Sequence, residues 1–117
     1  GRKNAQWIEI NGSRGSLRFD LEEMNYLNVF YRDDPDQQQG FRRISVTDPG
    51  HPYYEAWWPP GHTIGYQHTF VHQMADLLDS IRDDADIKPN FHDGLACQRV
   101  MDAIETSDSD GGWVSVS

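Results

Sequence analysis

The first part of the chain alternates between hydrophobic and polar residues with the two-residue period of a β-strand. In Gln6–Ile10, Trp7 and Glu9 fall on one face, whereas Ile8 and Ile10 fall on the other. The same period predicts three further strands, which are Ser16–Leu21, Asn25–Tyr31 and Phe41–Thr47.

The links between these segments are short, which favours an antiparallel meander. The Asn11-Gly12 dipeptide predicts a tight turn between the first two strands. In the second strand we expect Leu17, Phe19 and Leu21 to face inward.

The second half of the chain has the longer period of amphipathic helices. One helix is predicted from Tyr66 to Arg82 and a second from His92 to Ser107. Asn90, with Asp93 three residues later, is a cap-like start for the second helix. The expected inward stripes comprise Tyr66, Phe70, Met74, Leu77, Leu78 and Ile81 in the first helix and Cys97, Val100, Met101 and Ile104 in the second.

A last short strand is predicted from Trp113 to Val116, after the Gly-rich end of the second helix. Four strands, two helices and one strand give an α+β class, with an antiparallel β-sheet and both helices packed on one face. The length of 117 residues fits a single domain over residues 1–117.

Residues 48–65, DPGHPYYEAWWPPGHTIG, form an irregular loop, because four prolines and three glycines exclude long regular structure. A loop of this length is a candidate for function. His62, Tyr66, Trp57 and Trp58 are the candidate substrate-binding residues. Aromatic rings cover the C–H surfaces of a sugar or polyol, while imidazole and phenol groups bind its hydroxyls. The alternative is that the tryptophans pack in the core and His62 bonds the backbone.

His68 and His72 have the i, i+4 spacing with which a helix presents two imidazoles to one metal. Both are expected opposite the apolar stripe, on an exposed helix face, where a solvated surface is the favoured interpretation. Cys97 lies on an apolar stripe, so a buried and inert thiol is expected there.

The formal net charge is -9, which argues against nucleic acid as a partner. Aspartate dominates and only two lysines are present, as in proteins of a salt-loving source; an ordinary acidic bacterial protein is the alternative. The absence of a long apolar run indicates no membrane span, the N-terminus lacks an apolar signal region, and a single cysteine favours the cytoplasm. Without an initial Met, the chain is expected to be a fragment or processed product.

Three segments in order carry a family resemblance: the hairpin GSRGSLRFD, the segment PGHTIGYQHTF and the helix FHDGLACQRVMDAIETS. Together they resemble the C-terminal domain of the Gfo/Idh/MocA oxidoreductases, from about Trp7 to Val116. The resemblance implies a parent protein with an N-terminal Rossmann domain that binds NAD or NADP and moves a hydride to or from a sugar or polyol. It also implies a homo-oligomer formed through the sheet face.

The family motifs for chemistry are missing from this chain. It has no G-x-G-x-x-G turn, no Glu-Lys-Pro motif with its catalytic lysine and no Asp-x-x-x-His segment. We therefore expect no catalytic residue and no bound cofactor here, and a role as the substrate-pocket and oligomerisation domain. The alternative is a non-enzymatic sugar-sensing or interaction module of the same fold.

Overall fold

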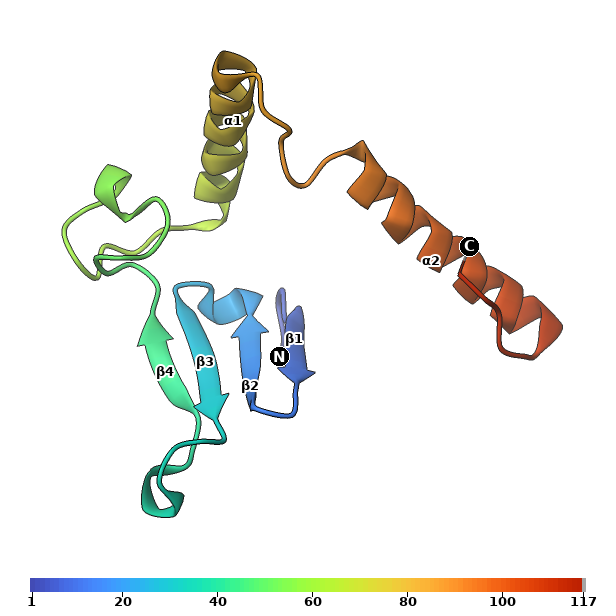
Figure 1. Ribbon diagram of the computed structural model, residues 1–117, viewed down its shortest axis with the longest axis horizontal. Coiled ribbons are helices and arrows are strands. Elements are labelled where there is room, and N and C mark those ends of the chain that lie inside the picture. Colours follow the sequence, from blue (N-terminus) through green and yellow to red (C-terminus); the bar gives the residue numbers. More distant parts are fainter. Residues whose placement is uncertain (117) are drawn as a thin grey trace. The chain divides into compact units, whose positions relative to one another are not determined.

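The computed structural model describes residues 1–116, which fall into two compact units; the first ends at His72 and the second begins at Gln73. The elements follow in the order of Figure 1. They are the strands β1 (Trp7–Asn11), β2 (Gly15–Asp20), β3 (Tyr26–Tyr31) and β4 (Arg42–Ser45), and the helices α1 (Tyr66–Asp83) and α2 (Phe91–Asp110). The α+β class is confirmed.

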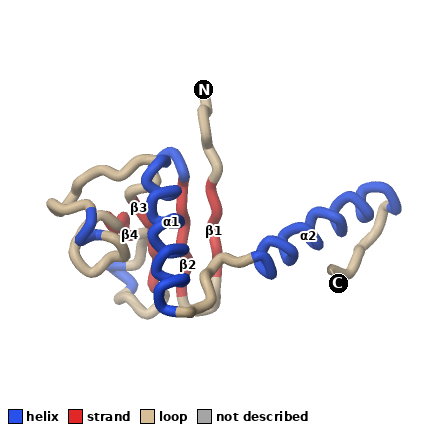
Figure 2. The backbone as a smooth tube through the Cα atoms, turned by 90° about the horizontal axis from the view of Figure 1, so that it is seen from above, coloured by secondary structure: helices blue, strands red, loops and turns tan. Residues whose placement is uncertain are grey.

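The four strands form one antiparallel sheet in the order β1-β2-β3-β4, so each strand pairs with the next along the chain. Figures 1 and 2 show these strands side by side. The observed strands differ from the predicted ones by a few residues at their ends, most at β4. The predicted meander is confirmed by this strand order. Its physical reason is that short connections between successive strands favour antiparallel neighbours.

The sheet has two chemically different faces. In the register, Ile8 lies opposite Phe19 and Phe19 opposite Leu27, so hydrophobic side chains follow one another across the sheet. The opposite face is mixed, since Glu9 lies opposite Arg18 there. The apolar face carries Ile8, Ile10, Leu17, Phe19, Leu27, Val29 and Ile44, and Arg42 of the edge strand β4 lies on it opposite Val29. The shared face predicted for Ile8 and Ile10 and for Leu17 and Phe19 is therefore confirmed, whereas Leu21 lies outside β2, in a 3-10 helix.

The turn between β1 and β2 lies two residues later than the Asn11-Gly12 dipeptide indicates. The amide of Gly12 donates to the carbonyl of Gly15 at 2.8 Å, and Ser13 and Arg14 make the bend. The register requires this position, because Asn11 remains paired with Ser16. The prediction of a turn at Asn11-Gly12 is thus wrong in its placement, although a tight turn is present.

Helix α2 begins with a complete capping box, as the cap-like pair of residues predicts. The side chain of Asn90 accepts hydrogen bonds from the amides of His92 and Asp93, and the Asp93 carboxylate accepts from the amide of Asn90. The helix ends at Gly111, whose φ of 71° is the left-handed conformation that glycine adopts without strain. Within residues 1–116 neither α1 nor α2 combines the length and apolar composition needed to cross a bilayer.

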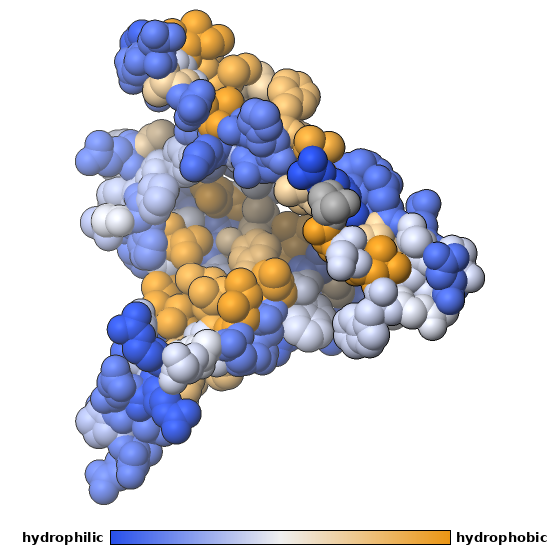
Figure 3. Space-filling view, turned by 45° about the vertical axis from the view of Figure 1, so that its right-hand side comes forward, coloured by the Kyte–Doolittle hydropathy of each residue, from blue (hydrophilic) through white to orange (hydrophobic). Residues whose placement is uncertain are grey.

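Among the described residues, only Thr47 is buried, and the apolar stripes of both helices are exposed. Figure 3 shows hydrophobic residues (orange) lying at the surface. Cys97 is exposed as well, so the expectation of a buried thiol is wrong. Packing of both helices on one sheet face stays a prediction.

The predicted last strand at residues 113–116 is absent: the segment is irregular. A strand exists only through backbone hydrogen bonds to a neighbouring strand, and none of the described strands pairs with this segment. Instead, the hydroxyl of Ser107 donates to the carbonyl of Gly112 at 2.6 Å, which turns the chain back along α2.

Candidate functional site

The loop of residues 48–65 is attached to the sheet at its C-terminal end. The side-chain amide of Asn25 donates to the carbonyl of Ile64 at 2.8 Å, and its oxygen accepts the Ile64 amide at 2.9 Å. Gly61, with a φ of 75°, donates its amide to the carbonyl of Thr47 at 2.9 Å. These bonds fix residues 61–64 beside the start of β3 and the end of β4.

Trp57 attaches the middle of the same loop to helix α1. Its indole Nε1–H donates to Nε2 of His72 at 2.5 Å. The edge of the indole also meets His68, with ring centroids 4.6 Å apart and planes at 87°. Because all three side chains are half-buried, the indole N–H has a partner where solvent is partly excluded.

Tyr53 completes this group of rings. Its phenol ring stacks on the imidazole of His72, with centroids 4.0 Å apart and an angle of 4° between the planes. We call Tyr53, Trp57, His68 and His72 the aromatic–histidine cluster. Its members come from the loop and from the first two turns of α1, so the cluster joins the two segments within the first unit.

The structure corrects the predicted surroundings of the two helical histidines. His68 and His72 do not lie on a fully exposed helix face; both are half-buried against Trp57. Nε2 of His72 accepts the indole proton, and Nδ1 of His68 accepts the amide of Gly65 at 2.8 Å. These lone pairs are the ones a metal would need. In the described part of the chain, no three His, Cys, Asp or Glu side chains gather as a metal site.

The other three candidate substrate-binding residues are open to solvent. Trp58 is 71% exposed and Tyr66 is 56% exposed, and His62 is exposed too. The amide of His62 donates to the carbonyl of Pro59 at 2.9 Å, so a backbone turn orients this residue while its ring is exposed. The ring of Tyr66 packs edge-on against Phe70, with centroids 5.4 Å apart. The structure thus joins Trp57 to His68 and His72, and leaves Trp58, His62 and Tyr66 as accessible groups.

Two carboxylates outside this loop have lowered pKa values. The backbone amides of Asn4 and Lys3 donate to the carboxylate of Glu22 and hold its pKa below the usual range. At the end of α1, the hydrogen bond from Arg82 lowers the pKa of Asp83.

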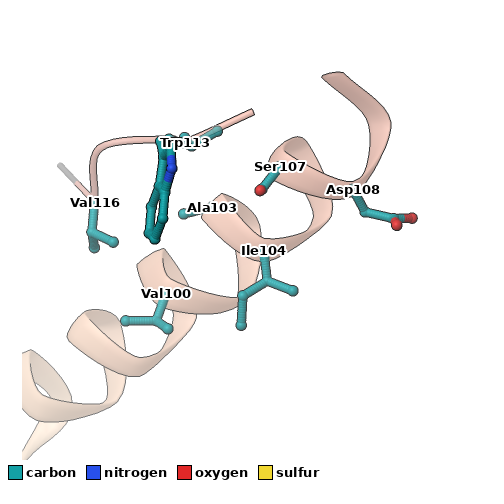
Figure 4. Close-up of a pocket in the computed structure, with 8 residues that line it drawn as sticks. Val100, Ala103, Ile104, Ser107, Asp108, Trp113 and Val116 are labelled. Carbon is teal, nitrogen blue, oxygen red and sulfur yellow. The ribbon is translucent and has the colours of Figure 1, made fainter. Parts of the chain in front are cut away.

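A second concave region, which the sequence pattern does not indicate, lies along the exposed stripe of α2 and the segment after it. It encloses about 510 Å³, and Figure 4 shows the Trp113 side chain directed toward the helix near Val100 and Ala103. Its lining is chiefly apolar and carries one carboxylate, Asp108. This composition fits a packing surface better than a reaction centre.

Sequence analysis missed the structural roles of Asn25 and Tyr53. Asn25 directly precedes a strand and reaches a residue 39 positions later, a contact for which local sequence carries no signal. For His68 and His72 the sequence does carry a signal, which is their i, i+4 spacing. Residues with this spacing share one helix face, so both imidazoles can contact the indole of Trp57.

Comparison with known proteins agrees with this architecture. Residues 1–116 match the family described as the oxidoreductase family, C-terminal alpha/beta domain. The levoglucosan dehydrogenase of Pseudarthrobacter phenanthrenivorans is 36% identical over 117 residues, covering 99% of this chain and 30% of that protein.

Two solved structures are similar over the full length of the chain. The oxidoreductase domain protein from Kribbella flavida has a TM-score of 0.96 and 50% identity, with 30% of its length covered. Levoglucosan dehydrogenase in complex with NADH and levoglucosan has a TM-score of 0.92 and 35% identity, with 32% covered. The chain thus spans about a third of the length of these relatives. It belongs to the Gfo/Idh/MocA oxidoreductases and corresponds to their C-terminal α/β domain.

Proposed function

We propose that this chain is the substrate-pocket and oligomerisation domain of a longer NAD(P)-dependent dehydrogenase that acts on a sugar or polyol. The match of residues 1–116 to one C-terminal domain carries the proposal, and it also supports assigning both compact units to a single domain. Similar structures contain NADH with levoglucosan or with L-sorbose. The proposed location of the parent protein is the cytoplasm.

The residues of this chain do not fit a dinucleotide site. Such a site places a glycine-rich turn between a strand and the N-terminus of a helix, so that backbone amides face the phosphates. Here α1 follows the loop of residues 48–65, and α2 follows α1. Within residues 1–116 no strand leads directly into an α-helix. We therefore assign NAD or NADP to a part of the parent protein outside this chain.

The proposed contribution of this domain is to bind and orient the substrate. Trp58 and Tyr66 offer exposed ring faces to the C–H surface of a sugar, and His62 offers an imidazole to a hydroxyl. We call Trp58, His62 and Tyr66 the substrate wall. Trp57 supports this wall from a half-buried position. Correct placement of the substrate lowers the entropic cost of the reaction, and we assign the proton-transfer group to the rest of the parent protein.

The test compares the full-length parent with this chain alone. We expect the parent to bind NAD(H) or NADP(H) in a fluorescence titration and to reduce the dinucleotide with a sugar or polyol, and this chain to do neither. Dinucleotide binding by this chain alone would overturn the proposal. A parent that binds a sugar without turnover would instead be a sensing module.

A matched pair of variants tests the pocket wall in the parent. His62→Ala is expected to raise KM for the sugar by about 5- to 10-fold, the worth of one hydrogen bond. His51→Ala removes a histidine of the same loop outside the proposed wall, and should leave KM unchanged. Equal KM values for the His62→Ala and His51→Ala variants would show that His62 does not bind the substrate.

The proposed oligomer forms through the mixed face of the sheet, since the apolar face suits the helices of the domain. On the mixed face Arg18 lies over the ring of Trp7 at 5.2 Å and Arg43 over that of Tyr26 at 3.9 Å. Arg, Trp and Tyr are enriched at protein interfaces. We expect light scattering to show a dimer or larger parent, Trp7→Asp to dissociate it, and Trp58→Asp to leave it intact. A monomeric parent would contradict this assignment.

A further inference from the structure

We propose that Trp57 and His72 are positioning residues for the substrate wall. Their hydrogen bond holds the loop of residues 48–65 on the first turns of α1 and thereby sets where Trp58 stands. This inference rests on the proposed sugar pocket, and its test separates the two.

The hydrogen bond is specific in its chemistry. An indole N–H is a donor only, and imidazole nitrogen is the acceptor that α1 supplies at this position. Nε2 of His72 accepts from Trp57 at 2.5 Å, so a neutral His72 carries its proton on Nδ1. A side chain without an acceptor at position 72 would leave the half-buried indole N–H without this partner.

Ring contacts fix the orientation of both partners. Tyr53 stacks on His72 at 4.0 Å, and His68 meets the indole of Trp57 almost perpendicularly at 4.6 Å. Offset-stacked and edge-to-face arrangements are the favoured geometries of aromatic pairs. The loop is thus held on α1 by two of its own aromatic residues, one five positions before Trp58 and one immediately before it.

Trp58, the first residue of the wall, lies between two fixed points. Trp57 is held by α1, and Gly61 is held by the carbonyl of Thr47 at 2.9 Å. Between them stand only Trp58, Pro59 and Pro60, and prolines restrict the backbone further. His62 follows directly after the second point. Release of Trp57 would therefore free one end of the segment that carries Trp58, while residues 61–64 stay attached to the sheet.

The experiment uses the full-length parent and two readouts. Hydrogen exchange followed by mass spectrometry reports the opening of residues 48–65 separately from that of β1–β4. Steady-state kinetics report KM and kcat for the sugar. The variants are His72→Phe, which keeps a ring without an acceptor, Trp57→Phe, which keeps a ring without a donor, and His72→Gln, which restores an acceptor. Gln73→Ala, on the same helix and exposed, is the matched control.

We expect His72→Phe and Trp57→Phe to raise the opening equilibrium constant of residues 48–65, as hydrogen exchange reports it, by about 5- to 10-fold. This factor corresponds to the loss of one hydrogen bond. Exchange in the strands should not change. KM should rise by a similar factor while kcat stays within about twofold. His72→Gln should recover most of both effects, and Gln73→Ala should show neither.

Unchanged exchange in residues 48–65 for both Phe variants would overturn the positioning role. Raised exchange with unchanged KM would leave Trp57 and His72 as anchors of the loop, and would instead remove the loop from the proposed pocket. If His72→Phe raises exchange throughout the strands, that variant has destabilised the sheet. The positioning role is then decided by Trp57→Phe and His72→Gln, from exchange in residues 48–65 and from KM for the sugar.

Discussion

The side-chain amide of Asn25 forms two hydrogen bonds with the backbone of Ile64, a residue 39 positions later in the chain. The amide NH2 and the amide oxygen of the Asn25 side chain thus match the carbonyl and the N–H of Ile64. The pairing resembles a single rung of a β-ladder made with a side chain. It connects the loop of residues 48–65 to the sheet without lengthening any strand.

Replacement of Asn25 should loosen this connection. Asn25→Ala removes both bonds and leaves the part-buried Ile64 backbone groups to find water. We expect a loss of roughly 2 kcal/mol in the free energy of unfolding, at about 1 kcal/mol for each bond. Urea denaturation of the full-length protein measures it. Asn28→Ala, on the strand β3 that directly follows Asn25, is the control and should cost much less; equal losses would contradict the role of Asn25.

Glycine is required at position 15 by close packing within the sheet. A Cβ atom built on Gly15 would stand 2.4 Å from the carbonyl oxygen of Phe30, a backbone atom on the paired strand. Gly15→Ala should therefore destabilise the protein by roughly 1–3 kcal/mol. At Gly12 the nearest atom to such a Cβ is 3.5 Å away, so Gly12→Ala should stay within about 0.5 kcal/mol. Thermal unfolding of the two variants side by side would refute this account if their midpoints coincided.

The capping box should make the first turn of α2 sensitive to position 90. Asn90→Ala removes the acceptor for the amides of His92 and Asp93, and should cost about 1 kcal/mol. Amide exchange in the first turn of α2 is the measurement. Asn90→Asp keeps an acceptor and should stay close to the original protein. Fast exchange in the Asp variant, equal to that in the Ala variant, would count against the cap.

The N-terminal segment should become less ordered in acid. Because the amides of Asn4 and Lys3 lower the pKa of Glu22 from its usual 4.5, the ionised carboxylate stabilises the ordered segment above that value. This contribution is lost as the pH falls through the lowered pKa. Amide exchange of Lys3 and Asn4, followed by NMR against pH, should show the transition, and Glu22→Gln should abolish it. Glu23→Gln, which removes the partner of Arg43, should preserve it.

Much of the fold follows from short-range pattern. The alternation of Ile8 and Ile10 with polar residues predicts which side chains share a sheet face, because successive Cβ atoms point to opposite sides of any strand. The cap at Asn90 is equally local, since its partners lie two and three residues away. Backbone geometry within a few residues suffices for both, so no knowledge of the chain path is needed.

Features that depend on the chain path escape this pattern. Trp57 and His72 are 15 residues apart, and their hydrogen bond requires the loop to return onto α1. The turn at Ser13 and Arg14 depends on how β1 and β2 align, which overrides the local preference of Asn11-Gly12 for a turn.

The exposure of Cys97 and the irregular conformation of residues 113–116 depend on which surfaces meet. An apolar stripe or an alternating segment specifies that a residue is suited to burial or to pairing. Burial itself, and every hydrogen bond of a strand, needs a second surface that the local sequence does not contain.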